Sequence, residues 1–309
     1  MAERTAYVNG EFLPESGASV SIYDRGFLSG LGVFERTRTF QGEIFHLDRH
    51  IARLYRSLKA IRLDPGLTLD EMHETTVELV RQNRGLLGPD EDYFVGHYIT
   101  RGPDTAGRAT VVILCEPIGF HKFAHHYIYG GHVITTHIRA IPTQVWDPKI
   151  KSTSRMHLWL AEQQAQLVDP EAYALLLTLE GNVTELTAAN FWIVRNGALV
   201  TAPVQNILSG ITRGAVLEVA EHLDIPVDET NFQLYDIMNA DEAFMTTTSR
   251  CVLPLTQING NAIGEGKPGP VVGRLQKGWT ELFGHDFVYQ ALKHIDKDKV
   301  PEGKEAVPL

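Results

Sequence analysis

One short segment near the middle of the chain, residues 147–156, constrains the fold more than any other. It contains Pro148, two lysines and a Ser-Thr-Ser run, and serine and threonine are typical of helix starts. Apolar residues then recur at helical spacing, at Met156, Trp159, Leu160 and Leu167. The segment therefore predicts a junction between two halves of the chain, followed by a helix with an apolar stripe.

Lys151 is notable in this segment because we predict it to lie at or just before the start of that helix. The positive end of a helix dipole disfavours a second positive charge, and burial adds to that effect. A desolvated lysine in this place would be partly a free amine, as Schiff-base chemistry requires. From the segment alone, a solvated surface lysine is the more common interpretation, since most lysines are exposed.

The length and composition indicate a globular protein of about two domains. The chain has 309 residues, 43% of them hydrophobic and 21% charged, with a formal net charge of −10. A nucleic-acid-binding protein would show a basic surface, so this balance argues against that class. The sequence starts without the apolar core of a signal peptide and has no run of about 18 apolar residues that could cross a membrane. With two cysteines and no disulfide framework, we expect a cytoplasmic protein without membrane or nucleic-acid partners.

The first half, residues 1–138, mixes helices with strands, and we predict a small N-terminal α/β domain of α+β pattern there. Its clearest helix covers residues 46–61, and a second helix is predicted at 68–83. A hairpin is predicted at 7–12, and strands at 19–23, 33–40, 93–101, 109–115 and 130–141. Residues 139–146 form the predicted connector to the second domain.

The predicted strand at 33–40 carries an unusual face. Alternation places Phe34, Arg36, Arg38 and Phe40 on the same side. Two arginines between aromatic residues suit an anionic ligand, because a guanidinium forms charge-assisted hydrogen bonds with carboxylates and phosphates. A solvent-facing surface with ordinary charges is the other interpretation of this pattern.

The second half, residues 147–292, is predicted to be the larger, C-terminal domain. Strands are predicted at 172–179, 183–194, 199–202, 225–227, 243–248 and 252–258, and helices start near 211 and at 269. The tail at 293–309 is charged and contains proline without an apolar period, so we expect it to be mobile. The fold class is thus a two-domain mixture of helices and sheets, α+β or α/β.

Two short segments have the composition of an anion-binding site. Residues 209–212, Ser-Gly-Ile-Thr, precede a predicted helix, where glycine permits close approach and the first N–H groups are unpaired. At the end of a later strand, further hydroxyl and amide donors come from Thr247, Thr248 and Ser249. A phosphate would use both segments and one arginine. Each segment alone is also compatible with a helix cap or a strand end.

Two further sets of residues could carry chemistry. Glu185 lies between turns, where it could face a cleft and pair with a protonated ring nitrogen, or simply lie on a sheet surface. His121, His125 and His126 could suggest a metal, but no H-E-x-x-H motif and no cysteine pairing supports them. We interpret these histidines as surface or loop residues and expect no metal.

Four separated motifs together give a specific resemblance. They are DRGFLSGLGVFE at 24–35, HIARL at 50–54, VTELTAAN at 183–190 and LSGITR at 208–213. In this order they resemble fold-type IV, pyridoxal-phosphate-dependent enzymes, the class IV aminotransferases. That group includes branched-chain and D-amino acid aminotransferases, R-selective amine transaminases and aminodeoxychorismate lyase. The resemblance extends over nearly the whole chain, from about residue 7 to about residue 283.

The resemblance implies a role for each candidate residue. Lys151, rather than its neighbour Lys149, would bind pyridoxal 5'-phosphate covalently and later move a proton, and Glu185 would pair with the pyridine nitrogen. The phosphate would be held by Arg53, the amides of Ile211 and Thr212, and the hydroxyls of Thr247 and Thr248. The substrate would be bound among Phe34, Arg36, Arg38, Arg101 and Ser249.

The resemblance also implies an activity and an assembly. An amino group would move between an amino acid, branched-chain-like or D, and a 2-oxo acid, in a homodimer with the cofactor between the two domains. The substrate stays open, because Arg155 is closer to the lyase pattern and the segment around Arg101 resembles D-amino acid aminotransferases. The alternatives are an aminodeoxychorismate lyase-like enzyme, an R-selective amine transaminase and a non-catalytic homologue.

Overall fold

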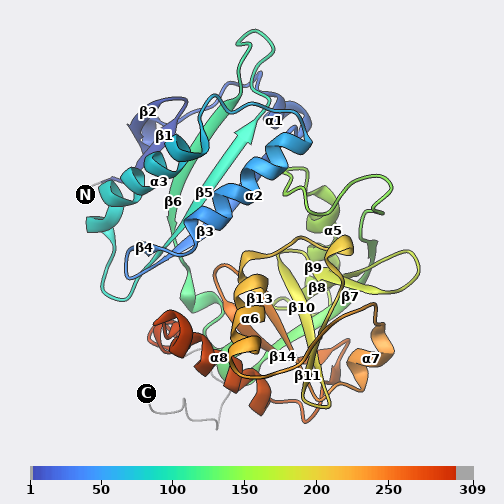
Figure 1. Cartoon of the computed structure of the whole chain (residues 1–309). Coiled ribbons are helices and arrows are strands. Elements are labelled where there is room, and N and C mark those ends of the chain that lie inside the picture. The colour runs from blue at the N-terminus through green and yellow to red at the C-terminus, as the bar shows by residue number, and fades with distance from the viewer. Residues whose placement is uncertain (1–2, 297–309) are drawn as a thin grey trace. The chain divides into compact units, whose positions relative to one another are not determined.

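The computed structural model describes residues 3–296, so residues 297–309 of the predicted tail lie outside the described residues. The described chain divides into two compact units (Figure 1). Unit 1 comprises the chain up to Ile118 together with Ile150–Arg155, and unit 2 comprises Gly119–Lys149 and the chain from Met156 onward. Helices and strands are mixed in both units, which confirms the predicted fold class. Among residues 3–296, no helix is long and apolar enough to span a membrane.

Unit 1 is built on an antiparallel sheet with the strand order β2-β1-β6-β5-β3-β4. The strands are β1 (Thr5–Val8), β2 (Glu11–Pro14), β3 (Gly32–Phe40), β4 (Glu43–Ile44), β5 (Tyr93–Thr100) and β6 (Thr110–Pro117). The predicted hairpin joins β1 to β2, with Asn9 and Gly10 both at positive φ, as a tight turn requires. The sheet supplies a rigid strand, β3, on which several candidate residues lie.

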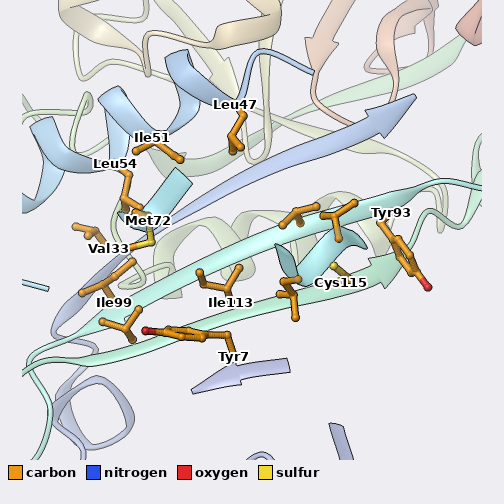
Figure 2. Close-up of a cluster of buried hydrophobic side chains, with 14 of the residues drawn as sticks. Tyr7, Val33, Leu47, Ile51, Leu54, Met72, Tyr93, Ile99, Ile113 and Cys115 are labelled. Atoms are coloured by element: carbon orange, nitrogen blue, oxygen red, sulfur yellow. The ribbon is translucent and has the colours of Figure 1, made fainter. Parts of the chain in front are cut away.

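The helices of unit 1 are α1 (Arg25–Ser29), α2 (Leu47–Ala60) and α3 (Leu69–Asn83). The apolar stripe predicted for α2 is confirmed at Leu47, Ile51, Leu54 and Leu58, which are all buried, whereas its last predicted member, Ile61, lies beyond the helix end and is exposed. A capping box between Thr68 and Glu71 starts α3. Figure 2 shows side chains of both long helices meeting those of the sheet in one buried cluster. The segment Ile150–Arg155 joins this unit through a bridge between Val33 and Ser152.

Unit 2 is built on a mixed sheet in the order β12-β11-β10-β13-β14-β7-β8-β9, in which β9 also pairs with β10. The strands are β7 (Gly131–Arg139), β8 (Tyr173–Leu177), β9 (Val183–Leu186), β10 (Ala189–Arg195), β11 (Ala198–Thr201), β12 (Val227–Glu229), β13 (Glu242–Thr247), β14 (Cys251–Ile258) and β15 (Asn261–Ala262). Its helices are α4 (His126–Tyr129), α5 (Met156–Gln166), α6 (Ile211–His222), α7 (Leu234–Met238), α8 (Pro270–Phe283) and α9 (Phe287–Leu292). The pairing of β9, β10 and β13 gathers the candidate residues of this unit.

Three predicted elements differ from the structure. Residues 19–23 form no strand, and the extended stretch at 183–194 is two strands, β9 and β10. The predicted apolar stripe of α5 is wrong as a core face, because Met156, Trp159 and Leu167 are exposed and the small residues Ala161 and Ala165 are buried instead. Small side chains let α5 approach its sheet closely, so its large apolar residues point outward.

The two units are divided differently from the two expected domains. The division falls at Ile118 rather than at residue 138, so β7 belongs to unit 2. The segment with Lys151 belongs to unit 1, whereas α5 begins at Met156 in unit 2. The structure therefore does not place Lys151 at the start of α5, and the helix-dipole argument for this lysine does not apply.

Candidate active site

Lys151 is held against the sheet and the long helix of unit 1 by its backbone. Its carbonyl oxygen accepts a hydrogen bond of 2.9 Å from the N–H of Phe34 on β3. Its own N–H donates to the hydroxyl of Ser57 on α2 over 3.3 Å. The side chain is half-buried, with Nζ 4.7 Å from the centroid of the Phe34 ring. Anchored at both backbone groups, Lys151 presents its amine in a defined direction.

The neighbouring lysine has a different environment. Lys149 is exposed, and its Nζ lies 2.9 Å from a carboxylate oxygen of Asp147. An exposed ion pair leaves the amine solvated and engaged with a carboxylate, which is unsuitable for a nucleophilic amine. The two environments favour Lys151 over Lys149 as the reactive residue.

The Phe34 ring is surrounded by cations and a second aromatic ring. The guanidinium carbon of Arg155 lies 5.4 Å from its centroid, within the range of a cation–π contact, as does Lys151. The ring of Tyr98 on β5 stacks on Phe34 at 5.9 Å with an interplanar angle of 10°. Arg36 then donates to the Tyr98 hydroxyl over 2.9 Å and to Glu116 over 2.9 Å. These contacts make the face of β3 a row of alternating cations and aromatic rings.

The other two candidate arginines for a substrate carboxylate lie in contrasting places. Arg38 is buried, donates to the carbonyl of Thr39, and lies 3.7 Å from the buried Asp92. Binding a substrate there would require breaking contacts inside the core. Arg101 is exposed and follows the end of β5. Of these two, only Arg101 has a side chain that solvent can reach.

The opposite face of β3 carries a buried charge cluster. Glu35 accepts from Nε of Arg53 over 2.8 Å and from Nδ1 of His50 over 3.0 Å. Burial alone would raise the pKa of Glu35, but the charge of Arg53 and the hydrogen bond from His50 hold the pKa well below its usual range. Burial lowers the pKa of His50, so His50 stays neutral and donates. Arg53 is thus fixed in orientation by a charged carboxylate.

Glu185 of unit 2 accepts hydrogen bonds from an asparagine side chain and from the backbone. One carboxylate oxygen accepts from the side-chain amide of Asn190 over 2.9 Å, and the other accepts from the backbone N–H of Leu208 over 3.1 Å. Asn190 also donates to the carbonyl of Leu208 over 2.9 Å. Glu185 lies on β9 and is half-buried, directly opposite Asn190 on β10. These donors clamp the carboxylate in a defined orientation.

The same asparagine connects Glu185 to the N-terminus of α6. A Cβ atom at Gly210 would lie 2.1 Å from Oδ1 of Asn190, so only glycine fits there. Gly210 is the N-cap of α6, and no side chain caps this end. The first helical N–H groups, including those of Ile211 and Thr212, are therefore available to an anion. The structure gathers Glu185 and the predicted anion-binding segment around Asn190.

The threonine segment lies on the next strand. Asn190 is paired with Thr246 in the register of β10 and β13, and Thr247 ends β13. Thr247 and Thr248 are half-buried, and Ser249 is buried. The pairing brings this strand end to the part of the sheet that carries Asn190 and Glu185. Unit 2 thus assembles a carboxylate, a helix N-terminus and a hydroxyl-rich strand end.

Comparison with known proteins agrees with this assembly. Residues 32–258 match the family model described as amino-transferase class IV. The chain belongs to the class IV aminotransferase family. This membership makes it an aminotransferase, as the four motifs indicate.

Relatives of this class IV aminotransferase carry two kinds of name. A provisional branched-chain-amino-acid aminotransferase of Methanocaldococcus jannaschii is 34% identical, over 89% of this chain and 95% of the relative. The D-alanine aminotransferase of Staphylococcus haemolyticus is 33% identical, over 89% of this chain and 96% of the relative. Such similar identities do not separate the two substrate classes.

Solved structures of branched-chain amino acid aminotransferases share the fold. The enzyme from T.th. with pyridoxamine 5'-phosphate has a TM-score of 0.83 at 28% identity, covering 91% of this chain and 94% of that one. The Thermoproteus uzoniensis enzyme with norvaline has a TM-score of 0.81 at 28% identity, covering 95% and 97%. These structures confirm the expected fold type.

Several supporting residues were not identified from the sequence. Glu35 and His50 lie inside the recognised motifs, but nothing in the pattern indicated that they hold Arg53. Asn190 also lies inside a motif, and its role as the clamp of Glu185 follows only from the pairing of β9 with β10. Tyr98 stands two positions before Thr100 on β5, and the alternation of that strand was the available signal for its contact with Phe34.

Proposed function

We propose that this aminotransferase uses pyridoxal 5'-phosphate to move an amino group from an amino acid to a 2-oxo acid. The observation that carries the proposal is the environment of Lys151, a half-buried amine anchored at β3 and α2 while Lys149 is tied to Asp147 in solvent. Two similar solved structures support it, since they contain pyridoxamine 5'-phosphate and N-(5'-phosphopyridoxyl)-L-glutamate.

The residues present fit this cofactor. An uncapped helix N-terminus behind Gly210 suits a phosphate, to which the Thr247 and Thr248 hydroxyls would add donors. Glu185, clamped by Asn190, suits a protonated ring nitrogen. Unit 1 holds two further residues that the resemblance assigns to the cofactor, Lys151 and Arg53, whose guanidinium is oriented by Glu35. The bound cofactor would supply the electron sink that the side chains lack.

The chain's own residues have three tasks in this proposal. Lys151 takes a proton from Cα of the substrate as general base and, as general acid, would deliver it to C4′ of the cofactor. Glu185 keeps a proton on the facing ring nitrogen through its fixed negative charge. Phe34 lines the side of the lysine amine and limits its contact with water.

We propose that Arg101 binds the substrate carboxylate, with Arg36 as the second candidate. Arg101 is exposed, whereas Arg36 already donates to Tyr98 and Glu116. An arginine forms charge-assisted, often bidentate bonds to a carboxylate. Replacing Arg101 by alanine should lower kcat/KM for amino acids roughly ten- to a hundred-fold and spare primary amines, which have no carboxylate.

A donor panel tests the proposal. Both enantiomers of branched-chain amino acids, alanine and glutamate, and (R)- and (S)-1-phenylethylamine, are offered with pyruvate or 2-oxoglutarate, and the 2-oxo acid or ketone formed is quantified. Transamination predicts equal amounts of new amino acid and new oxo product from one donor class. Production of pyruvate and 4-aminobenzoate from aminodeoxychorismate, without any amino transfer, would instead support the lyase alternative.

We also propose a homodimer. Unit 1 exposes a dense group of large apolar side chains over a short segment around α1, with exposed fractions of 51–72% at Val20, Ile22, Tyr23, Phe27, Leu28 and Leu31. Such a group marks an interaction surface, and a second copy of the chain is the proposed partner. Light scattering should give twice the chain mass, and Phe27→Glu should shift it toward the monomer. A wild-type monomer at micromolar concentration would contradict the proposal.

A further inference from the structure

Two adjacent histidines at the start of α4 converge on one carboxylate. Nε2 of His125 lies 3.0 Å, and Nε2 of His126 lies 3.8 Å, from the same oxygen of Glu171. The two histidine side chains are only 6% and 8% exposed, so neither is a surface residue, although His125 lies in the turn before α4 as a loop residue would. His121, by contrast, is exposed as expected. Glu171 is separated from His125 by 46 positions, so no spacing motif revealed the cluster.

We propose that His125, His126 and Glu171 bind a divalent transition-metal ion, with Zn²⁺ as the best match. One donor atom from each residue lies within 4.8 Å of the others. Zinc binds imidazole nitrogen and carboxylate oxygen at about 2.0–2.2 Å, which separates tetrahedral ligand atoms by roughly 3.4 Å. The two separations of 3.0 and 3.8 Å bracket that value. Two nitrogens and one oxygen suit zinc better than calcium or magnesium, which prefer oxygen.

The surroundings orient the ligands. Nδ1 of His126 lies 2.7 Å from the hydroxyl oxygen of Tyr173, so His126 can direct Nε2 toward Glu171 while Nδ1 carries the proton. The backbone N–H of Glu171 donates to Asp169 over 3.0 Å and fixes the turn before β8. These second contacts resemble those that support histidine ligands in metal sites.

Nearby charges and exposure to solvent determine the affinity of the proposed site for a metal ion. The side chain of Glu171 is 44% exposed, which gives an ion a route in and leaves a position for water as fourth ligand. Asp169, whose partner is His132 at 2.8 Å, adds a second negative charge nearby. Arg250 lies over the Tyr173 ring at 5.4 Å and opposes a cation. The site would therefore bind more weakly than a closed structural zinc site, and its ion would connect α4 to the turn before β8.

The test uses the untagged, full-length protein after chelator treatment and dialysis. Zn²⁺ is titrated by calorimetry, and Co²⁺ is added in parallel because tetrahedral Co²⁺ absorbs visible light strongly. The proposal predicts one equivalent of Zn²⁺, a tetrahedral Co²⁺ spectrum, and loss of both in His126→Ala and Glu171→Gln. Tyr173→Phe should weaken binding about tenfold, because it removes only the orienting hydroxyl. His121→Ala, the exposed control, should bind like the wild type.

Transaminase turnover serves as the check on folding, since Glu171→Gln alters no residue assigned to the active site. If Glu171→Gln keeps turnover and loses the metal, the site is as proposed. If every variant still binds one equivalent of Zn²⁺ with the wild-type affinity, the ion is adventitious and the proposal is wrong. The same conclusion follows if every variant, including the control His121→Ala, loses the metal. Absence of binding to the wild type at about 100 µM metal would show that His125 and Glu171 form a plain hydrogen bond.

Discussion

Glu35 of unit 1 and Glu185 of unit 2 lie in opposite kinds of surroundings. Glu35 is fully buried and bonded to the guanidinium of Arg53 and the imidazole of His50. Glu185 is half-buried and accepts from an asparagine amide and a backbone N–H. Breaking a fully buried ion pair is costly, whereas amide and backbone donors orient a carboxylate that solvent still reaches. Glu35 is therefore expected to hold the fold and Arg53, and Glu185 to act on the chemistry.

The largest effect is predicted for removal of the Lys151 amine, which neither glutamate can replace. Lys151→Ala should lower the turnover of the best amino donor on the order of 10³- to 10⁴-fold, because both the covalent anchor and the proton carrier are lost. Lys149→Ala is the matched control and should stay within about twofold, as an exposed ion pair contributes little. Steady-state rates measure both. The reverse pattern would transfer the catalytic role to Lys149.

The next largest effect is predicted for Glu35→Gln. Removing one partner of a buried ion pair leaves the other charge uncompensated, at a cost of about 3–5 kcal/mol. The urea midpoint of unfolding at pH 7 should fall accordingly. Glu43→Gln on the neighbouring β4 is the control, since Glu43 pairs with Arg84 in solvent and its loss should leave the midpoint unchanged. Equal midpoints for Glu35→Gln and the wild type would show that Glu35 does not stabilise the fold.

His97, on the same buried side of unit 1, gives a pH test. Burial lowers its pKa to about 4 from the usual 6.5, against the raising effect of Glu35. The Thr76 hydroxyl donates to Met72, so it accepts from Nε2–H of His97, and Nδ1 is buried without a hydrogen-bond partner. In the unfolded chain His97 binds a proton below about pH 6.5, whereas in the folded chain it binds one only below about pH 4. Stability should therefore fall with decreasing pH in that window, by roughly 3 kcal/mol for this group.

The matched variants isolate this contribution. His97→Gln keeps an amide donor for Thr76 and cannot titrate, so its unfolding midpoint should depend less on pH between 6.5 and 4 than that of the wild type. His50, whose pKa burial also lowers, stays in both proteins and cancels in the difference. The exposed His121→Gln should keep the wild-type slope. Identical slopes for His97→Gln and the wild type would show that His97 is protonated in the folded state.

The smallest of these effects is predicted for Glu185→Gln, the same substitution as at Glu35. Glutamine can keep one hydrogen bond to the clamp, but it carries no charge. Loss of the charge should cost about 1.5–3 kcal/mol in the transition state, which lowers the single-turnover rate roughly ten- to a hundred-fold. The urea midpoint should hardly change, because the site is half-buried. If Glu185→Gln lowered stability and spared the rate, while Glu35→Gln did the opposite, the comparison would be reversed.

The sequence predicted the elements whose pattern is local and missed what depends on packing between distant segments. The stripe of α2 and the turn at Asn9-Gly10 agree with the structure because each rests on neighbouring residues. The α5 stripe failed, because Ala161 and Ala165, not the large apolar side chains, face the sheet. Helical spacing shows which residues share a face, but not whether that face is buried.

The candidate site shows the same limit. Motifs indicated Arg53 and Glu185, and the family resemblance indicated Lys151. The contacts of all three follow only from the pairing of strands and the packing of helices. Arg38 looked like a ligand-binding arginine by alternation, yet it is buried beside Asp92, a residue 54 positions away from it in the chain and invisible to a strand pattern. His125 and Glu171 are likewise joined only in the folded unit.

The central claim, that Lys151 carries the cofactor, is tested most directly by chemical fixation. The protein is loaded with pyridoxal 5'-phosphate, reduced with borohydride, digested with trypsin and analysed by mass spectrometry. We predict one reduced pyridoxyl phosphate group per chain, on the peptide from Ile150 to Arg155, in which the modified Lys151 resists cleavage. The group should be released into solution or scattered over surface lysines in Lys151→Ala. Stoichiometric labelling of Lys149, or of any other single lysine in the wild type, would contradict the account.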